Sequence, residues 1–252
     1  DITTSAKPEV VMSLFEKTIA TGLAHGTVTV IINKIPIEVT TFRVETGYAD
    51  YRHPNEVIFT ASLEDDLNQF ICFCKEKLER IDVLVNNACV SHQGILNQCN
   101  YQEFQKSLSI GVTAPYYLSL QCQDELKKNK GSIINIASSR AFQSEPNTES
   151  YTSAKGGIVA LTHALAISLS GQVRVNCIAP GWIDVNDTES FSKEDETAIP
   201  VGRVGKPIDI ARMVMFLCSE DAGFITGETF VVDGGMSKRM IYHGDHGWEY
   251  HI

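Results

Sequence analysis

The chain has 252 residues, 43% of them hydrophobic, which is enough to bury a sizeable core in one large or two small domains. Its formal net charge of -10 argues against loose binding to nucleic acid, which requires clustered Lys and Arg. No apolar run approaches the roughly 20 residues that span a bilayer, and no apolar leader opens the chain. The seven Cys are scattered without CxxC pairs, so we expect free thiols in a cytoplasmic protein with no membrane partner. The His residues of the C-terminal tail have no spacing on a helix or strand, and no metal site is expected there.

Residues 1–66 predict a small α+β region. "KPEVVMSLFEK" is typical of a short helix with Pro8 in its first turn. "GTVTVIIN" and "IPIEVTTFR" are β-rich runs joined by Lys34, and their spacing predicts an antiparallel hairpin. The glycines of "ATGLAHGTVTV", residues 20–30, resemble a dinucleotide-binding turn. Since a helix end and a short link precede them and a strand follows, the strand–turn–helix order of such a turn is not expected here.

From residue 81 onward, the pattern alternates between buried strands and helices. Strands are predicted in "IDVLVNNA", "GSIINIAS", "QVRVNCIAPG" and "ETFVVDGG". Helices are predicted over about 101–128, in "SYTSAKGGIVALTHALAISLS" and in "KPIDIARMVMFLCSE". The polar segment 184–206 is typical of a loop or lid. Strands separated by helices predict right-handed βαβ units, and therefore a parallel sheet with helices on both faces.

Several polar residues in this region could form one catalytic site. Tyr151 and Lys155 lie one helical turn apart on the same face, and a nearby cation is expected to lower the pKa of a phenol. Ser138 ends a predicted strand, where its hydroxyl can bind a substrate carbonyl. The segments 86–88 and 180–181 end two further strands. Three strand ends and one helix face are therefore predicted to meet in one crevice.

Together, "NNA", "INIASS", "YTSAK", "NCIAPGW" and "FITGETFVVDGG" resemble the short-chain dehydrogenase/reductase family in order and spacing over residues 67–252. The resemblance implies hydride transfer between NAD or NADP and a small alcohol or carbonyl substrate. It implies that Tyr151 is the general acid or base, that Lys155 holds the nicotinamide ribose and that Ser138 orients the substrate oxygen. It also implies a homo-oligomer. The implied cofactor-binding residues are Asn86, Asn87, Ala88, Lys155, Pro180, Gly181 and Ile183.

The sequence departs from this family at two positions. Gly111 stands where the family usually has an Asn that completes a proton relay, so a relay here would depend on water alone. Cys89 stands where the family motif has Gly, and we expect a small buried thiol there, in preference to a reactive one.

Residues 1–66 resemble a second family, the catalytic head of bacterial CCA-adding enzymes and poly(A) polymerases. The blocks "DITTSAKPEVVMSLF", "TGLAHGTVTV", "IEVTTFR", "GYADYRHPNEVIF" and "SLEDDL" carry this resemblance. In that family, paired carboxylates bind catalytic Mg²⁺ for nucleotidyl transfer to tRNA. Asp1 matches the second carboxylate of the pair, Glu38 matches a third, and the first would precede the chain.

The predicted fold class is therefore α/β, an incomplete Rossmann-like parallel sheet preceded by a small nucleotidyltransferase-like fragment. The predicted domains are residues 1–66 and residues 67–252, the second lacking its first βαβαβ and its glycine-rich cofactor loop. Three interpretations stay open: a short-chain oxidoreductase, a fragment of a tRNA nucleotidyltransferase, and an inactive chimera of the two.

Overall fold

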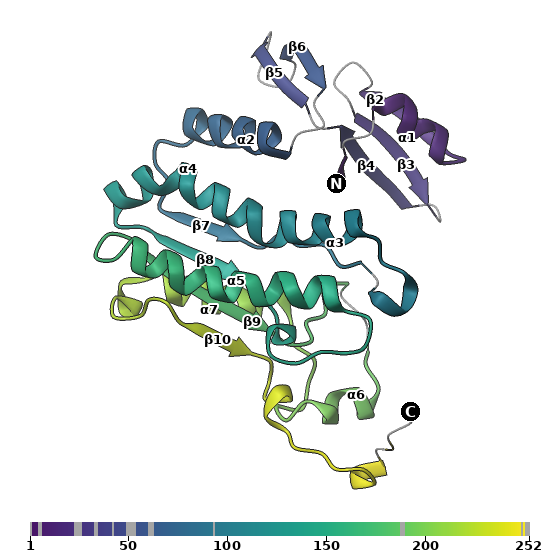
Figure 1. The fold of residues 1–252 in the computed structure, drawn as a ribbon, viewed down its shortest axis with the longest axis vertical. Coiled ribbons are helices and arrows are strands. Elements are labelled where there is room, and N and C mark those ends of the chain that lie inside the picture. The colour runs from purple at the N-terminus through teal and green to yellow at the C-terminus, as the bar shows by residue number, and fades with distance from the viewer. Residues whose placement is uncertain are drawn as a thin grey trace. The chain divides into compact units, whose positions relative to one another are not determined.

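The computed structural model describes residues 2–4, 7–22, 27–32, 35–41, 43–48, 54–59, 63–92, 94–186, 190–247 and 249. The chain divides into a first unit, Asp1–Glu79, and a second unit, Arg80–Ile252 (Figure 1). This boundary lies beyond the predicted boundary after residue 66. Helix α2 (Leu63–Lys77) contacts strand β5 (Arg43–Tyr48), and the helix therefore belongs to the first unit.

The first unit contains a four-stranded sheet with the order β1-β4-β3-β2. Strands β2, β3 and β4 are antiparallel neighbours, whereas β1 is parallel to β4. A separate hairpin pairs β5 with β6. The remaining bounds are β1 (Ile2–Thr4), α1 (Pro8–Leu14), β2 (Thr18–Gly22), β3 (Thr27–Ile32), β4 (Ile35–Thr41) and β6 (Pro54–Phe59).

The helix at Pro8 and the antiparallel hairpin of β3 and β4 confirm the sequence prediction. The predicted link before Gly22 is wrong in one respect, because Thr18–Gly22 forms strand β2 and pairs with β3. Its residues Thr18 and Ile19 are β-branched, which suits a pleated strand. In the neighbouring strand β3, Val28 is fully buried and packs with Val11 and Val30. The segment 20–30 therefore joins two strands, and does not lead from a strand into a helix.

The second unit contains a parallel sheet with the order β10-β9-β8-β7, as the alternation of strands and helices predicted. Its strands are β7 (Val83–Asn86), β8 (Ser132–Ile136), β9 (Arg174–Pro180) and β10 (Thr229–Val232). Its helices are α3 (Tyr101–Leu108), α4 (Ala114–Asn129), α5 (Glu149–Ser168), α6 (Lys193–Ala198) and α7 (Pro207–Cys218). A π-helical turn, η3 (Ser109–Thr113), joins α3 to α4. Short 3-10 turns complete the unit: η2 (Ile95–Asn97), η4 (Ser139–Ala141), η5 (Glu220–Ala222), η6 (Met236–Lys238) and η7 (Asp245–Gly247).

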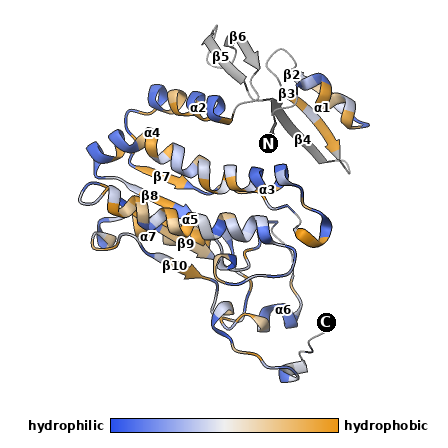
Figure 2. Cartoon of the chain, in the orientation of Figure 1, coloured by the Kyte–Doolittle hydropathy of each residue, from blue (hydrophilic) through white to orange (hydrophobic). Residues whose placement is uncertain are grey.

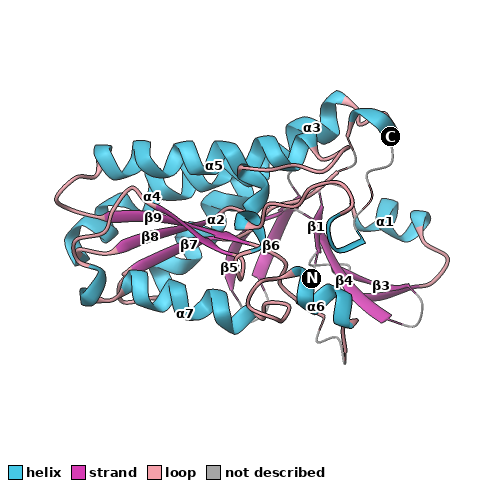
Figure 3. Cartoon of the chain, turned by 90° about the horizontal axis from the view of Figure 1, so that it is seen from below, coloured by secondary structure: helices cyan, strands magenta, loops and turns pink. Residues whose placement is uncertain are grey.

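The helices cover both faces of this sheet, with α5 on one face and α7 on the other (Figure 3). Successive side chains of β8 point to opposite faces, so Ile133 packs with the α4 and α5 residues Leu126 and Ala166, whereas Ile134 packs with Leu217 of α7. The strands are the hydrophobic layer of this unit (Figure 2). Burial on both faces explains why most residues of β8 and β9 are apolar.

Strand β7 lies at one edge of the sheet formed by the described strands of this unit. Val83 and Val85 of β7 are 40% and 43% exposed, although their side chains are apolar. In the sheet that the family resemblance implies, a further parallel strand would pair with β7 at this edge. Within the described ranges, no helix combines the length and the hydropathy needed to cross a membrane.

Candidate active site

Tyr151 and Lys155 lie in the first two turns of α5 and face one cavity of about 560 Å³. Such a volume is within the usual range for sites that bind cofactors and small molecules. The cavity lies where β8 and β9 end. Its lining consists of Val85, Asn87, Cys89, Ile136, Ala137, Ser138, Tyr151, Lys155, Pro180, Gly181, Ile183, Val185, Pro207, Ile210, Ala211 and Val214. The structure therefore brings the predicted Ser138, Tyr151 and Lys155 together.

Lys155 is only 4% exposed. Its Nζ donates a hydrogen bond of 2.7 Å to the carbonyl oxygen of Ile136 at the end of β8, and lies 5.5 Å from the centroid of the Tyr151 ring. Burial lowers the pKa of the Lys155 ammonium, since it disfavours the charged form. The hydrogen bond fixes the ammonium beside the phenol.

Ser138 and Tyr151 line the same cavity. Burial raises the pKa of Tyr151, and the Ser138 hydroxyl opposes this effect only in part. The net shift of this pKa is therefore opposite to the lowering that the sequence predicted beside Lys155. The reason is that desolvation of the phenol is the largest influence, while the ammonium donates to a backbone carbonyl.

The residues at the strand ends divide into two groups. Asn87, Pro180, Gly181 and Ile183 line the cavity, as the resemblance implies for cofactor-binding residues. Ala88, by contrast, is exposed outside the cavity lining.

Asn86 also lies outside the cavity lining and is buried beneath it. Its Nδ2 donates to Oδ1 of Asn135 at 2.8 Å, and Asn135 Nδ2 donates to Oγ1 of Thr162 at 2.9 Å. The Oδ1 of Asn86 has no hydrogen-bond partner among the described residues. In this structure, Asn86 therefore connects β7 to β8 and α5 within the core.

Cys89 and Gly111 are adjacent in space, although 22 positions separate 89 from 111. A Cβ atom on Gly111 would lie 3.1 Å from Cys89 Sγ and 2.8 Å from the Cβ of Ala154. The space that an Asn side chain would need at position 111 is therefore occupied by the thiol and by α5. Cys89 is half-buried and lines the catalytic cavity, whereas the sequence predicted a buried thiol, and burial raises its pKa.

Sequence reasoning missed the apolar wall that α7 contributes. Pro207, Ile210, Ala211 and Val214 line the cavity at helical spacing, i, i+3, i+4 and i+7. The periodicity was visible in the sequence, but it is equally typical of a helix that packs only against its own sheet.

The predicted lid, 184–206, contains α6 and closes back on its own start. Ile183 pairs with Gly205 in an isolated parallel bridge. The Asp184 amide donates to the Gly205 carbonyl at 2.9 Å, and the Gly205 amide donates to the Trp182 carbonyl at 3.1 Å. These bonds fix both ends of the lid beside the catalytic cavity.

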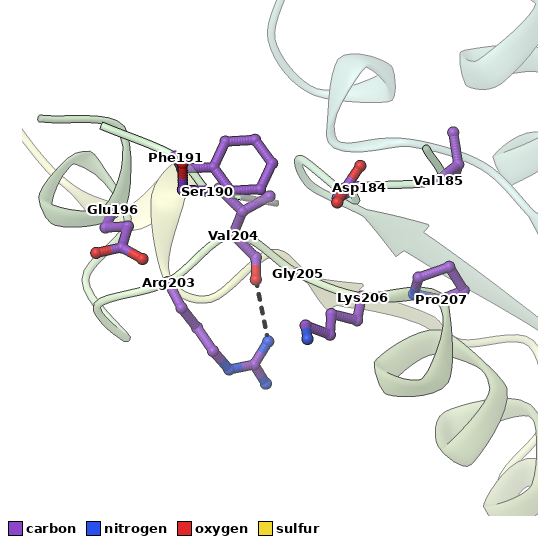
Figure 4. Close-up of a pocket in the computed structure, with 10 residues that line it drawn as sticks. All are labelled: Asp184, Val185, Ser190, Phe191, Glu196, Arg203, Val204, Gly205, Lys206 and Pro207. Atoms are coloured by element: carbon purple, nitrogen blue, oxygen red, sulfur yellow. Dashed lines mark hydrogen bonds between the residues drawn. The ribbon is translucent and has the colours of Figure 1, made fainter. Parts of the chain in front are cut away.

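A second cavity of about 530 Å³ lies under the lid (Figure 4). It shares Val185 and Pro207 with the catalytic cavity, so the two cavities adjoin. Its charged lining residues are Asp184, Glu196, Arg203 and Lys206, and Figure 4 shows the side chains of Arg203 and Lys206 extending toward each other.

The predicted carboxylates of the first unit are not placed by the structure. Asp1 lies outside the described residues, and Glu38 lies in β4 but its side chain is not described. Among the side chains that are described, no group of three His, Cys, Asp or Glu residues could hold a metal ion.

Comparisons with known proteins place this chain among oxidoreductases. A family model described as Enoyl-(Acyl carrier protein) reductase matches residues 17–237. An uncharacterized oxidoreductase of Thermotoga maritima is 47% identical over 173 residues, which are 64% of this chain and 68% of that protein. The 3-oxoacyl-[acyl-carrier-protein] reductase FabG of Chlamydia pneumoniae is 35% identical over 72% of this chain and 74% of its own length.

Solved structures give the same result. The apo SCOR enzyme from Clostridium thermocellum is 63% identical, with a TM-score of 0.71 over 75% of this chain and 76% of that one. A blue fluorescent protein from a metagenomic library, solved in complex with NADPH, is 29% identical, with a TM-score of 0.63 over 69% of this chain and 72% of that one. The chain belongs to the short-chain dehydrogenase/reductase family, and it is an oxidoreductase of that type with a Rossmann-like parallel sheet. None of these relatives supports the nucleotidyltransferase resemblance of residues 1–66, which stays a prediction.

Proposed function

We propose that this chain transfers a hydride between NAD or NADP and a small alcohol or carbonyl substrate, with Ser138, Tyr151 and Lys155 as its catalytic residues. The observation that carries this proposal is that the three side chains meet at one cavity where β8 and β9 end. The family relationship indicates the reaction class, and the shared cavity supports the choice of these three residues.

The donor set of the cavity fits the nicotinamide end of the cofactor. When bound, the nicotinamide accepts or supplies the hydride. The ammonium of Lys155 would hold the ribose, while Pro180, Gly181 and Ile183 would border the ring. The apolar wall of α7 would exclude water from this end of the cavity, which strengthens the polar interactions within it.

The proton would move at the Oη atom of Tyr151. Ser138 lines the same cavity as this phenol, and its hydroxyl would orient the substrate oxygen. Because burial keeps the phenol protonated at neutral pH, the arrangement suits donation of a proton to a carbonyl oxygen. We therefore propose that Tyr151 acts as the general acid when a carbonyl is reduced.

The fit is incomplete at the pyrophosphate end of the cofactor. Among the described residues of the second unit, no strand–turn–helix segment precedes β7. A turn that brings backbone amides close to a pyrophosphate uses glycine for that approach. We propose that dinucleotide affinity depends mainly on the nicotinamide end and is weaker than in relatives with a complete glycine turn.

Fluorescence titration of the full chain with NADH and with NADPH tests this proposal, together with turnover of a panel of small carbonyls that includes a 3-oxoacyl thioester. We expect saturable binding of at least one cofactor. Tyr151→Phe is expected to keep that binding and to lose about 100-fold or more in kcat. Absence of saturable binding up to millimolar cofactor would contradict the proposal, as would unchanged kcat in the Tyr151→Phe variant.

The resemblance of residues 1–66 to a nucleotidyltransferase head also stays a proposal, together with the division of the chain after residue 66 and the hypothesis of an inactive chimera. Strand β1 follows Asp1 in the sequence and is parallel to β4. Mg²⁺-dependent incorporation of CTP or ATP into tRNA tests this activity, and we expect none because the relatives of this chain are oxidoreductases.

We also propose a cytoplasmic homo-oligomer, which light scattering of the full chain can check.

A further inference from the structure

The lid is held not only at its ends but also by the segment that follows β10. The guanidinium of Arg239 reaches the C-terminal end of α6, where Nη1 donates to the carbonyl oxygens of Thr197 at 2.8 Å and Ala198 at 3.2 Å. The last carbonyls of a helix have no partner within the helix, so a side-chain donor there satisfies groups that otherwise need water. The contact joins residues more than 40 positions apart along the chain.

The turn that carries Arg239 is itself rigidly placed. The carboxylate of Asp233 accepts hydrogen bonds from the amides of Gly235 at 2.8 Å and Ser237 at 2.7 Å. Gly234 has a φ of +64°, and a Cβ there would lie 2.6 Å from Ile199 and 2.8 Å from Val201, the residues just after α6. The Val201 amide also donates to the Gly234 carbonyl at 3.1 Å. Arg239 therefore extends from a fixed turn onto the helix of the lid.

Other residues of the lid border the two cavities. Phe191 and Glu196 line the cavity under the lid, and Val185 at its start lines both cavities. Phe191 packs edge-on against Trp182, with ring centroids 5.4 Å apart. A displacement of α6 would therefore change the wall of the space that adjoins Tyr151.

We propose that Arg239 is a positioning residue that holds α6 and the lid in the conformation that binds substrate. It acts through the lid and does not touch the reacting atoms. This inference rests on the proposed function for its kinetic part, whereas its structural part does not depend on catalysis.

The experiment compares the full chain with the variants Arg239→Ala, Arg239→Lys and Lys238→Ala. Hydrogen exchange followed by mass spectrometry measures the lid peptides over residues 190–204, with peptides from β8 and β9 as an internal standard for global unfolding. Lys238 is the control, because it is exposed and adjacent and its removal changes the net charge equally. For Arg239→Ala, we expect about 10-fold faster exchange in the lid peptides and unchanged exchange in β8 and β9. Arg239→Lys should restore part of the protection, and Lys238→Ala should match the parent chain.

Steady-state kinetics on the same variants provides the second measurement. We expect Arg239→Ala to raise the KM for the carbonyl substrate by about 10-fold while kcat changes by less than about 2-fold. Equal lid exchange in Arg239→Ala and Lys238→Ala would overturn the proposal, and so would faster lid exchange with an unchanged KM. If the parent chain reduces no carbonyl, the proposed function fails, while faster lid exchange in Arg239→Ala would still support the positioning contact.

Discussion

At the scale of single residues, the catalytic cavity shows how burial changes two ionisable groups in opposite directions. Lys155 is buried and Tyr151 is half-buried, and each is pushed toward its neutral form, so the phenol pKa rises and the ammonium pKa falls. A neutral phenol and a neutral amine cost less to bury than a phenolate and an ammonium. The packing around α5 therefore favours the neutral phenol of Tyr151.

The raised pKa of Tyr151 predicts a dependence of stability on pH. A group whose folded pKa is raised favours the protonated state, so its contribution is complete below the unfolded value of about 10 and is lost as pH rises through the folded value. The Tyr151→Phe variant cannot ionise at this position. We therefore expect the parent chain to lose stability relative to Tyr151→Phe as pH rises above about 10, measured by urea denaturation at a series of pH values. A constant difference between the two proteins from pH 8 to 11 would show that the phenol is not buried as described.

Asp209 predicts the opposite dependence. Arg203 donates two hydrogen bonds to its carboxylate, at 2.7 and 2.9 Å, and lowers its pKa to about 2. A lowered pKa gives stability that is present above the unfolded value of about 3.9 and is lost as pH falls through the folded value. Asp209→Asn should therefore lower Tm by about 1–3 °C at neutral pH, and the difference should shrink between about pH 4 and pH 2. Asp221→Asn, at another exposed carboxylate, is the control and should leave Tm nearly unchanged.

At the scale of elements, the packing of η3 against α5 limits what position 111 can carry. Gly111 is buried, and an added Cβ would lie 2.8 Å from the Cβ of Ala154, one turn from Tyr151 on the same helix. This contact is too close for two carbon atoms, so a larger residue must push the two elements apart.

We expect Gly111→Ala to cost about 1–3 kcal/mol of unfolding free energy and to lower activity, because α5 carries Tyr151 and Lys155. Gly156→Ala is the matched control on α5 itself. A Cβ at Gly156 meets nothing within 4 Å, so this change should be neutral or should stabilise the helix by up to about 1 kcal/mol. Chemical denaturation of both variants checks the prediction, and equal stability of the two would contradict the packing described for Gly111.

At the scale of the whole molecule, the exposed edge of the second unit's sheet could pair with another chain. Among the described strands, β7 pairs with β8 on one side, and its Val83 side chain is 40% exposed. An unprotected apolar edge strand is a common template for association between chains.

Val83→Lys is expected to lower concentration-dependent association of the full chain, since a charge on an edge strand disfavours pairing. Static light scattering over a range of concentrations measures this effect. Ile95→Lys, at a residue that is 77% exposed and outside the sheet, is the control and should leave association unchanged. If both variants associate as the parent chain does, the edge of β7 is not the surface involved.

The elements of the second unit could be predicted because each has its own periodicity. The runs at 83–86 and 132–136 are strands, of which 132–136 is buried throughout and 83–86 is partly exposed, and the spacing of Tyr151 and Lys155 follows from one helical turn. In the first unit, the hairpin was predicted from β-branched residues alone, whereas β2 was missed, since five residues after a helix resemble a link until their partner strand is known. The compact units divide later than the predicted domains, after Glu79, because α2 contacts β5.

The amino-acid sequence by itself determined the family, the order of strands and helices, and the presence of Ser138, Tyr151 and Lys155 at positions that could meet. Only the tertiary structure decided that Asn86 lies beneath the cavity, that α7 provides its apolar wall, and that Cys89 fills the space beside Gly111. It also decided the directions in which the pKa values of Tyr151 and Lys155 move. The physical reason is that periodicity and spacing are local properties of the chain, whereas burial and desolvation depend on every element packed around a group.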